Sequence, residues 1–136
     1  MTLECINPDD IPAPQTYSHV VIATGSRQVF VAGQVAEDSE GNLVGPGDMT
    51  AQARQVFANI GRALAAAGAR PDQVTKLTIF VANYRREHLE MIEEGRVALF
   101  GDHKPADTLV GVAVLSRSDY LLEVDAIAVM DDAVQR

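Results

Sequence analysis

Residues 120–129 form an alternating segment that limits the possible folds more than any other part of the chain. The side chains of a strand point to opposite faces in turn. One face would carry Tyr120, Leu122, Val124, Ala126 and Ala128, and the other Leu121, Glu123, Asp125, Ile127 and Val129. Two carboxylates, those of Glu123 and Asp125, therefore share one face of an otherwise apolar strand. Because charged side chains are rarely buried without partners, we expect this face to meet water, a ligand or a neighbouring subunit.

The whole chain alternates between strand and helix signals in the order β-β-α-β-α-β-β. The expected strands cover residues 18–23, 28–34, 74–82, 108–115 and 120–129, and the expected helices cover 49–67 and 86–100. A turn at 25–27 would join the first two strands as a β-hairpin, and the polar turn 116–119 would join the last pair. Three prolines mark residues 1–15 as an extended arm, and 131–136 read as a polar tail.

The first helix has the clearest pattern. Apolar residues spaced three and four apart define one face, namely Met49, Ala53, Val56, Phe57, Ile60, Leu64 and Ala67. Asp48 is expected to cap the N-terminus of this helix, and Gly68 its C-terminus. Four polar residues lie outside the apolar stripe and are expected on the surface, namely Gln52, Gln55, Asn59 and Arg62. In the second helix the stripe is weaker, and Arg96 contributes to it only through its aliphatic stem.

The order of elements predicts an α+β fold with a single mixed sheet and two helices packed on one face. At 136 residues the chain is expected to form one domain, residues 1–136. The second face of the sheet would carry Phe30, Phe80 and Ile127, which is more apolar surface than a solvated face tolerates. We therefore expect a homo-oligomer that buries this second face.

Composition excludes several classes of partner. The net charge of -8 argues against nucleic acid and against an anionic membrane surface, because both attract concentrated positive charge. The single Cys5 cannot form an intramolecular disulfide, which is typical of a reducing compartment. No segment approaches the roughly 20 apolar residues that span a bilayer, and the first residues lack the pattern of a signal peptide. A cytoplasmic location is expected.

Five stretches, taken together and in order, resemble one known family. They are residues 14–18 (PQTYS), 31–34 (VAGQ), 52–60 (QARQVFANI), 74–81 (VTKLTIFV) and 122–129 (LEVDAIAV). With them the chain resembles the RidA family, also called the YjgF/YER057c or endoribonuclease L-PSP family, over nearly its whole length.

The resemblance implies a chorismate-mutase-like fold and a homotrimer whose sheets form a central barrel with clefts between subunits. It also implies hydrolysis of reactive enamines and imines with release of ammonia. In active members, a Tyr after the N-terminal arm and the backbone after the second strand line the cleft, and a Glu on the last strand positions the attacking water. These positions correspond to Tyr17, Gly33 and Glu123. No cofactor is expected.

At two positions the chain departs from the family pattern. Active members clamp the substrate carboxylate with the Arg of a Pro-Ala-Arg segment, which reads Pro105-Ala106-Asp107 here. A position of the second helix that is often Asn appears as Glu93. Asp offers no bidentate donors to a carboxylate and repels its charge, so the usual recognition of 2-iminoacids is expected to be lost.

Each candidate site residue also has a purely structural interpretation. Glu123 either handles a water molecule or is a solvated or Arg-paired carboxylate at a subunit interface. Asp107 either contacts a ligand or accepts a backbone bond at the start of a strand, and Tyr17 either lines the cleft or packs under the arm. Together, Glu93, Asp107 and Glu123 could hold an amine, a cationic ligand or a divalent metal. No spacing motif indicates a metal, and none is expected.

Two functions remain open. The chain could be a RidA-like trimer that binds a small metabolite between subunits and hydrolyses an enamine or imine, with substrate choice altered by Asp107. It could instead be a non-catalytic trimer that senses a metabolite or binds a partner, including a chaperone-like role. Ribonuclease activity, suggested by the older family name, is not expected, because the chain is acidic and has no catalytic His pair.

Overall fold

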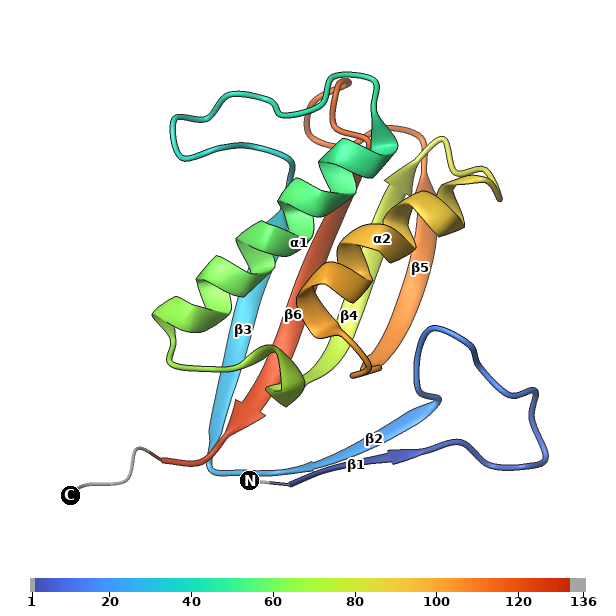
Figure 1. The fold of residues 1–136 in the computed structure, drawn as a ribbon, viewed down its shortest axis with the longest axis vertical. Coiled ribbons are helices and arrows are strands. Elements are labelled where there is room, and N and C mark those ends of the chain that lie inside the picture. Colours follow the sequence, from blue (N-terminus) through green and yellow to red (C-terminus); the bar gives the residue numbers. More distant parts are fainter. Residues whose placement is uncertain (1, 133–136) are drawn as a thin grey trace.

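A computed structural model describes residues 2–132 of the chain. Two helices cover one face of a four-stranded mixed sheet, and a separate two-stranded hairpin crosses one end of that sheet (Figure 1). The strands are β1 (Thr2–Ile6), β2 (Val20–Thr24), β3 (Arg27–Gln34), β4 (Val74–Ala82), β5 (Ala106–Val112) and β6 (Leu122–Met130). The helices are α1 (Met49–Ala66), α2 (His88–Phe100) and the short 3-10 helix η1 (Pro71–Gln73). The predicted α+β architecture with both helices on one face is confirmed.

The alternation that predicted the last strand is present in β6. Leu122 and Val124 are fully buried in one core cluster with Val56 and Ile60 of α1, whereas Glu123 is half-buried on the opposite face. The bounds of β4 match the prediction. Its alternate residues Leu77, Ile79 and Val81 are buried in the same core cluster.

The predicted pairing of the last two strands is wrong. The strand order is β3-β6-β4-β5, so β4 lies between β5 and β6. The α2 crossover makes β4 and β5 parallel, whereas β6 runs antiparallel to β4 and to β3. An alternating pattern shows which face of a strand is buried, but it does not identify the neighbouring strand.

The predicted hairpin of the first two strands is also wrong. The partner of β2 is β1, a strand that was expected only as part of an extended arm, and Cys5 lies opposite Val21. Gly25, between β2 and β3, does not have the positive φ that a tight two-residue hairpin turn requires. The chain therefore leaves β2 and enters a different sheet.

The ends of the helices follow their local sequence. Asp48 caps α1 by accepting a hydrogen bond from the Ala51 amide, and Gly68, with φ of +80°, follows one residue beyond the C-cap. The second helix begins at His88, two residues later than expected. Neither long helix of residues 2–132 is apolar enough over its length to cross a membrane. Of the expected polar tail, residues 133–136 lie outside the described part of the chain.

Gln52 was expected on the surface, but its side chain is fully buried. Its Nε2 donates to the carbonyl oxygens of Gly45 and Asp119, both at 3.1 Å, and its Oε1 accepts from the Leu121 amide at 2.9 Å. One amide group therefore links α1 to the loop before it and to the loop that leads into β6. These three bonds compensate for burying a polar side chain.

The sheet face opposite the helices is only partly covered. The side chain of Phe30 is 69% exposed, and Phe80 and Ile127 on the same face are half-buried. Such a patch is typical of an association surface. Leu121, which was predicted on this face, packs against the helix-covered core instead. The homotrimer remains a prediction, because one chain alone is described.

Replacing Gln52 by Leu should destabilise the fold by roughly 3 kcal/mol, because three buried backbone groups would lose their partner. Urea unfolding at pH 7 measures this change. The control is Gln55→Leu, one turn further along α1, where the side chain is half-buried and the expected loss is about 1 kcal/mol. Equal losses in the two variants would contradict the linking role of Gln52.

Candidate functional site

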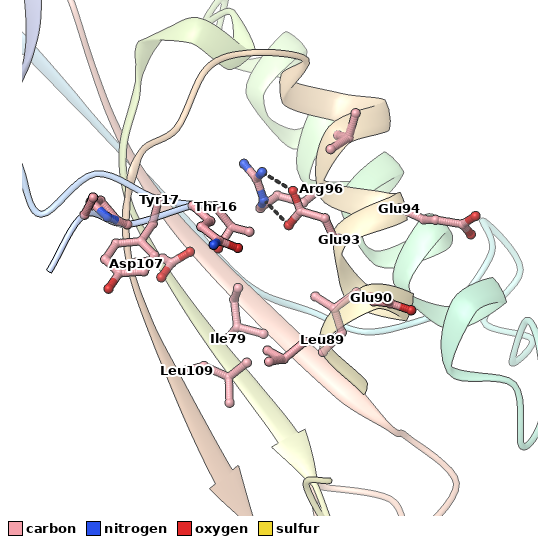
Figure 2. Close-up of a pocket in the computed structure, with 15 residues that line it drawn as sticks. Thr16, Tyr17, Ile79, Leu89, Glu90, Glu93, Glu94, Arg96, Asp107 and Leu109 are labelled. Atoms are coloured by element: carbon pink, nitrogen blue, oxygen red, sulfur yellow. Dashed lines mark hydrogen bonds and ion pairs between the residues drawn. The ribbon is translucent and has the colours of Figure 1, made fainter. Parts of the chain in front are cut away.

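A cavity of about 840 Å³ lies between the end of the N-terminal arm, α2 and the β5 edge of the sheet (Figure 2). Its apolar wall consists of Ile79, Leu89, Ile92, Val97 and Leu109. Polar groups enter from three elements: Thr16 and Tyr17 from the arm, Glu93 and Arg96 from α2, and Asp107 from β5. An apolar cavity with a few converging polar groups is the usual form of a small-molecule site.

A buried ion pair forms one wall of this cavity. Arg96 is 3% exposed, and its Nε donates to Oε2 of Glu93 at 2.8 Å while its Nη2 donates to Oε1 of the same carboxylate. The two residues are three apart on α2, where side chains are neighbours. Because Glu93 is the counter-ion of Arg96, the pair adds little net charge to the cavity.

Sequence reasoning missed Arg96 as a site residue. The prediction placed Arg96 in the apolar stripe of α2 through its aliphatic stem. The guanidinium group was not assigned a role. The available signal was the spacing of Glu93 and Arg96, which is that of an ion pair on a helix.

Asp107 is near the start of β5, opposite Leu77 and on the helix-covered face of the sheet. Burial raises the pKa of its carboxyl to about 6, although the charges of Arg96 and Lys76 act in the opposite direction. No hydrogen bond to this carboxyl occurs within residues 2–132. Asp107 is therefore a carboxyl that changes protonation near neutral pH and is free to bind a donor from a ligand.

The arm holds Tyr17 beside the strand of Asp107. The next residue, Ser18, donates from its amide to the Pro105 carbonyl at 3.2 Å and from its hydroxyl to the Lys104 carbonyl at 2.5 Å. The Tyr17 ring also meets the His19 ring edge to face, with centroids 5.4 Å apart. These contacts fix the end of the arm against the segment that enters β5.

Gly33 and Glu123 form a second group on β3 and β6. A Cβ atom added to Gly33 would lie 2.0 Å from Oε2 of Glu123, so a larger residue would force this carboxylate out of its present position. The Glu123 carboxylate makes no hydrogen bond or ion pair within residues 2–132. Its strand position is opposite Phe80, on the open face of the sheet.

The five predicted site residues thus fall into two half-sites. Tyr17, Glu93 and Asp107 line the cavity, and Gly33 and Glu123 touch each other. Asp107 is on the helix-covered face and Glu123 on the open face, so one chain does not bring the two acids together. Within residues 2–132, no cluster of three potential metal ligands is present. The cavity half can bind a neutral or cationic group, and the Glu123 half can accept a proton.

Comparisons with known proteins identify the family. The model of the family described as Endoribonuclease L-PSP matches residues 8–130. The chain is 33% identical to the RutC family protein slr0709 of Synechocystis, with 96% of this chain and 98% of the relative covered. It is also 33% identical to the 2-iminobutanoate/2-iminopropanoate deaminase of Rattus norvegicus, over 83% of this chain and 79% of the relative.

Solved structures agree with the sequence comparisons. The Rid-family protein YyfB of Yersinia pestis, described as of unknown function, superposes with a TM-score of 0.89 at 34% identity, covering 96% of this chain and all of the other. Yeast Mmf1 superposes with a TM-score of 0.68 at 30% identity, covering 95% of this chain and 99% of the other. The chain therefore belongs to the endoribonuclease L-PSP family, which is the RidA/YjgF family that its sequence resembles.

Proposed function

We propose that the chain forms a homotrimer that binds a small metabolite in clefts between subunits and hydrolyses an enamine or imine that lacks the usual carboxylate. The observation that carries this proposal is the Asp107 carboxyl, which faces an apolar cavity without a hydrogen-bond partner in residues 2–132. Family membership supports the reaction class, since mammalian relatives are named 2-iminobutanoate/2-iminopropanoate deaminases.

The charges of the cavity support the altered substrate class. The Arg96 charge is already neutralised by Glu93, and Glu94 is paired with Arg54. Asp107 faces the cavity without an ion-pair partner in residues 2–132. A substrate carboxylate would be repelled there, whereas a protonated imine would be attracted and would favour the ionised form of Asp107. The apolar wall suits a hydrocarbon substituent on the imine carbon.

Glu123 has the chemistry required for the hydrolytic step. Its carboxylate can accept a proton from a water molecule as the water oxygen bonds to the imine carbon. The electron pair of the C=N bond moves to nitrogen, which becomes an amine. Protonated Glu123 then returns its proton to this nitrogen. The C–N bond breaks as the new hydroxyl group loses its proton to water, and ammonia and a carbonyl compound are released. No electron donor or acceptor is consumed.

A non-catalytic trimer is the second candidate, and Asp107 favours it. The family Arg that clamps the substrate has been replaced, and without a clamp an imine can bind without being positioned for attack. In that case the cavity would serve as a metabolite sensor or as a site for a protein partner.

Glu123→Gln should lower kcat by about 100-fold on an imine that lacks a carboxylate, because the amide cannot accept the proton of water. Ammonia release is measured from imines generated in situ, with 2-iminobutanoate as the carboxylate-bearing comparison. Glu40→Gln, in an exposed loop, is the matched control and should keep full activity. Absence of turnover on every imine in the wild-type protein would exclude the enzyme and leave the binding function.

Mixing Asp107→Asn chains with Glu123→Gln chains should restore activity if each site takes one acid from each of two subunits. After joint unfolding and refolding of equal amounts, roughly a quarter of all sites would carry both wild-type acids. The activity of the mixture is compared with that of each variant refolded alone. A mixture no more active than its two components would show that the acids do not share a site between chains.

The raised pKa of Asp107 predicts that ionisation of this carboxyl weakens the fold. The pKa is about 6 in the folded chain against an ordinary value of 3.8, so the folded state binds the proton more tightly between these values. The contribution of protonated Asp107 to the free energy of unfolding is complete below pH 4 and is lost as pH rises through 6.

Asp107→Asn should remove this dependence. The stability of the wild type relative to the variant should fall by about 1–2 kcal/mol from pH 4 to pH 7, since water at the cavity mouth screens part of the effect. Urea unfolding at several pH values measures it, with the exposed Asp102→Asn as control. If the stability difference between the wild type and Asp107→Asn stayed constant with pH, the raised pKa could not belong to Asp107.

A further inference from the structure

We propose that residues 2–24 are an exchange arm, in which β2 of one protomer pairs with the free edge of β3 in a second copy of the chain. This pairing would bring Gly33 and Glu123 of the second copy to Tyr17 and Asp107 of the first. The proposal rests on the proposed function only in treating these residues as parts of one site.

Both strand edges required for the exchange are open. In the described chain β3 is an edge strand whose only neighbour is β6, and β2 pairs on one side only, with β1 (Figure 1). The unpaired amide and carbonyl groups of such edges are templates for another strand. Apolar side chains accompany both edges, because Val20, Ile22 and Phe30 are 41%, 49% and 69% exposed.

The connection between β2 and β3 favours exchange over a closed hairpin. Only Gly25 and Ser26 separate the two strands, and Gly25 lacks the positive φ of a tight turn. A short connection that does not close into a turn is the feature that promotes domain swapping. The hydroxyl of Ser26 also accepts a hydrogen bond from the Asp132 amide at 2.9 Å, which ties the connection to the segment after β6.

The register of the exchanged pair follows from the sequence. A swapped element makes with its partner the contacts that it would make within a closed monomer. A two-residue turn at Gly25 and Ser26 would set Thr24 opposite Arg27, and Ile22 opposite Val29. Continued two residues before β2 and to the irregularity of β3 between Val31 and Gln34, this register sets Ser18 beside Gly33.

This register joins the two half-sites. In its own chain Ser18 is bonded to the carbonyls of Lys104 and Pro105, so the arm keeps Tyr17 beside Asp107. Gly33 of the second copy, which is in contact with Glu123 of that copy, would lie beside Ser18. One exchanged strand therefore supplies both the intersubunit contact and a complete site.

Structures of relatives differ in how closely they superpose on this chain. YyfB and yeast Mmf1 have similar identity and coverage, yet their TM-scores against this chain are 0.89 and 0.68. The chain therefore superposes more closely on YyfB than on Mmf1.

Disulfide trapping between separate chains tests the proposal. In a Cys5→Ser background, one chain carries Ile22→Cys and another carries Val29→Cys. They are unfolded together, refolded and oxidised. A second pair, Ala23→Cys with Gln28→Cys, covers the adjacent register position, because only one of two adjacent pairs has the short separation that suits a disulfide. The expected result is a covalent dimer on a non-reducing gel in at least one mixture.

The controls separate exchange from chance and from a closed hairpin. Each single-cysteine chain alone should stay monomeric on the gel, as should the out-of-register pair Val20→Cys with Arg27→Cys. With both cysteines of a pair in one chain, exchange predicts covalent oligomers, whereas a closed hairpin predicts only an intrachain bond. Intrachain bonds alone, or no bond in either pair, would overturn the proposal.

The gel does not depend on activity. Trapped dimers without turnover on any imine would support the exchange arm and contradict imine hydrolysis. Turnover without trapped dimers would support imine hydrolysis and contradict the exchange arm.

Discussion

Burial of one face of β6 beneath α1 is the contact on which the rest of the structure depends. Leu122, Val124 and Ala128 are inaccessible to water, and each large aliphatic side chain buried in this way contributes about 1.5–3 kcal/mol. Because the period of a strand is two, this burial directs Glu123 and Asp125 to the opposite face. The same apolar contact that holds the layers together thus aims the proposed proton acceptor away from the core.

Predictions from sequence succeeded where a short stretch of chain determines its own conformation. The bounds of β4, the start of α1 at Asp48 and the two faces of β6 all follow from local periodicity and capping. Predictions failed where the outcome depends on which elements meet in space. The partner of β2 and the position of β4 between β5 and β6 are tertiary choices, and Gln52 is buried because two distant loops converge on it.

Some features of the candidate site could be predicted from sequence, and others depend on the folded arrangement. Tyr17, Glu93 and Asp107 were predicted from the family resemblance, and the structure brings them around one cavity. Arg96 was missed because its role depends on burial against Glu93, which a helical pattern alone does not reveal. The raised pKa of Asp107 also comes mainly from burial, which no single stretch of sequence specifies. The separation of Glu123 from Asp107 appears only when the faces of the sheet are assigned.

The close approach of the two helices has a consequence for the evolution of the cavity. A Cβ atom on Gly95 would lie 2.7 Å from the carbonyl oxygen of Ala53 and 3.0 Å from the Phe57 ring, so a larger residue would push α2 outward. Leu89, Glu93 and Arg96 are on that same helix and form a wall of the cavity. The ligand preference of the pocket can therefore drift through substitutions between the helices, without any change in the residues that touch the ligand.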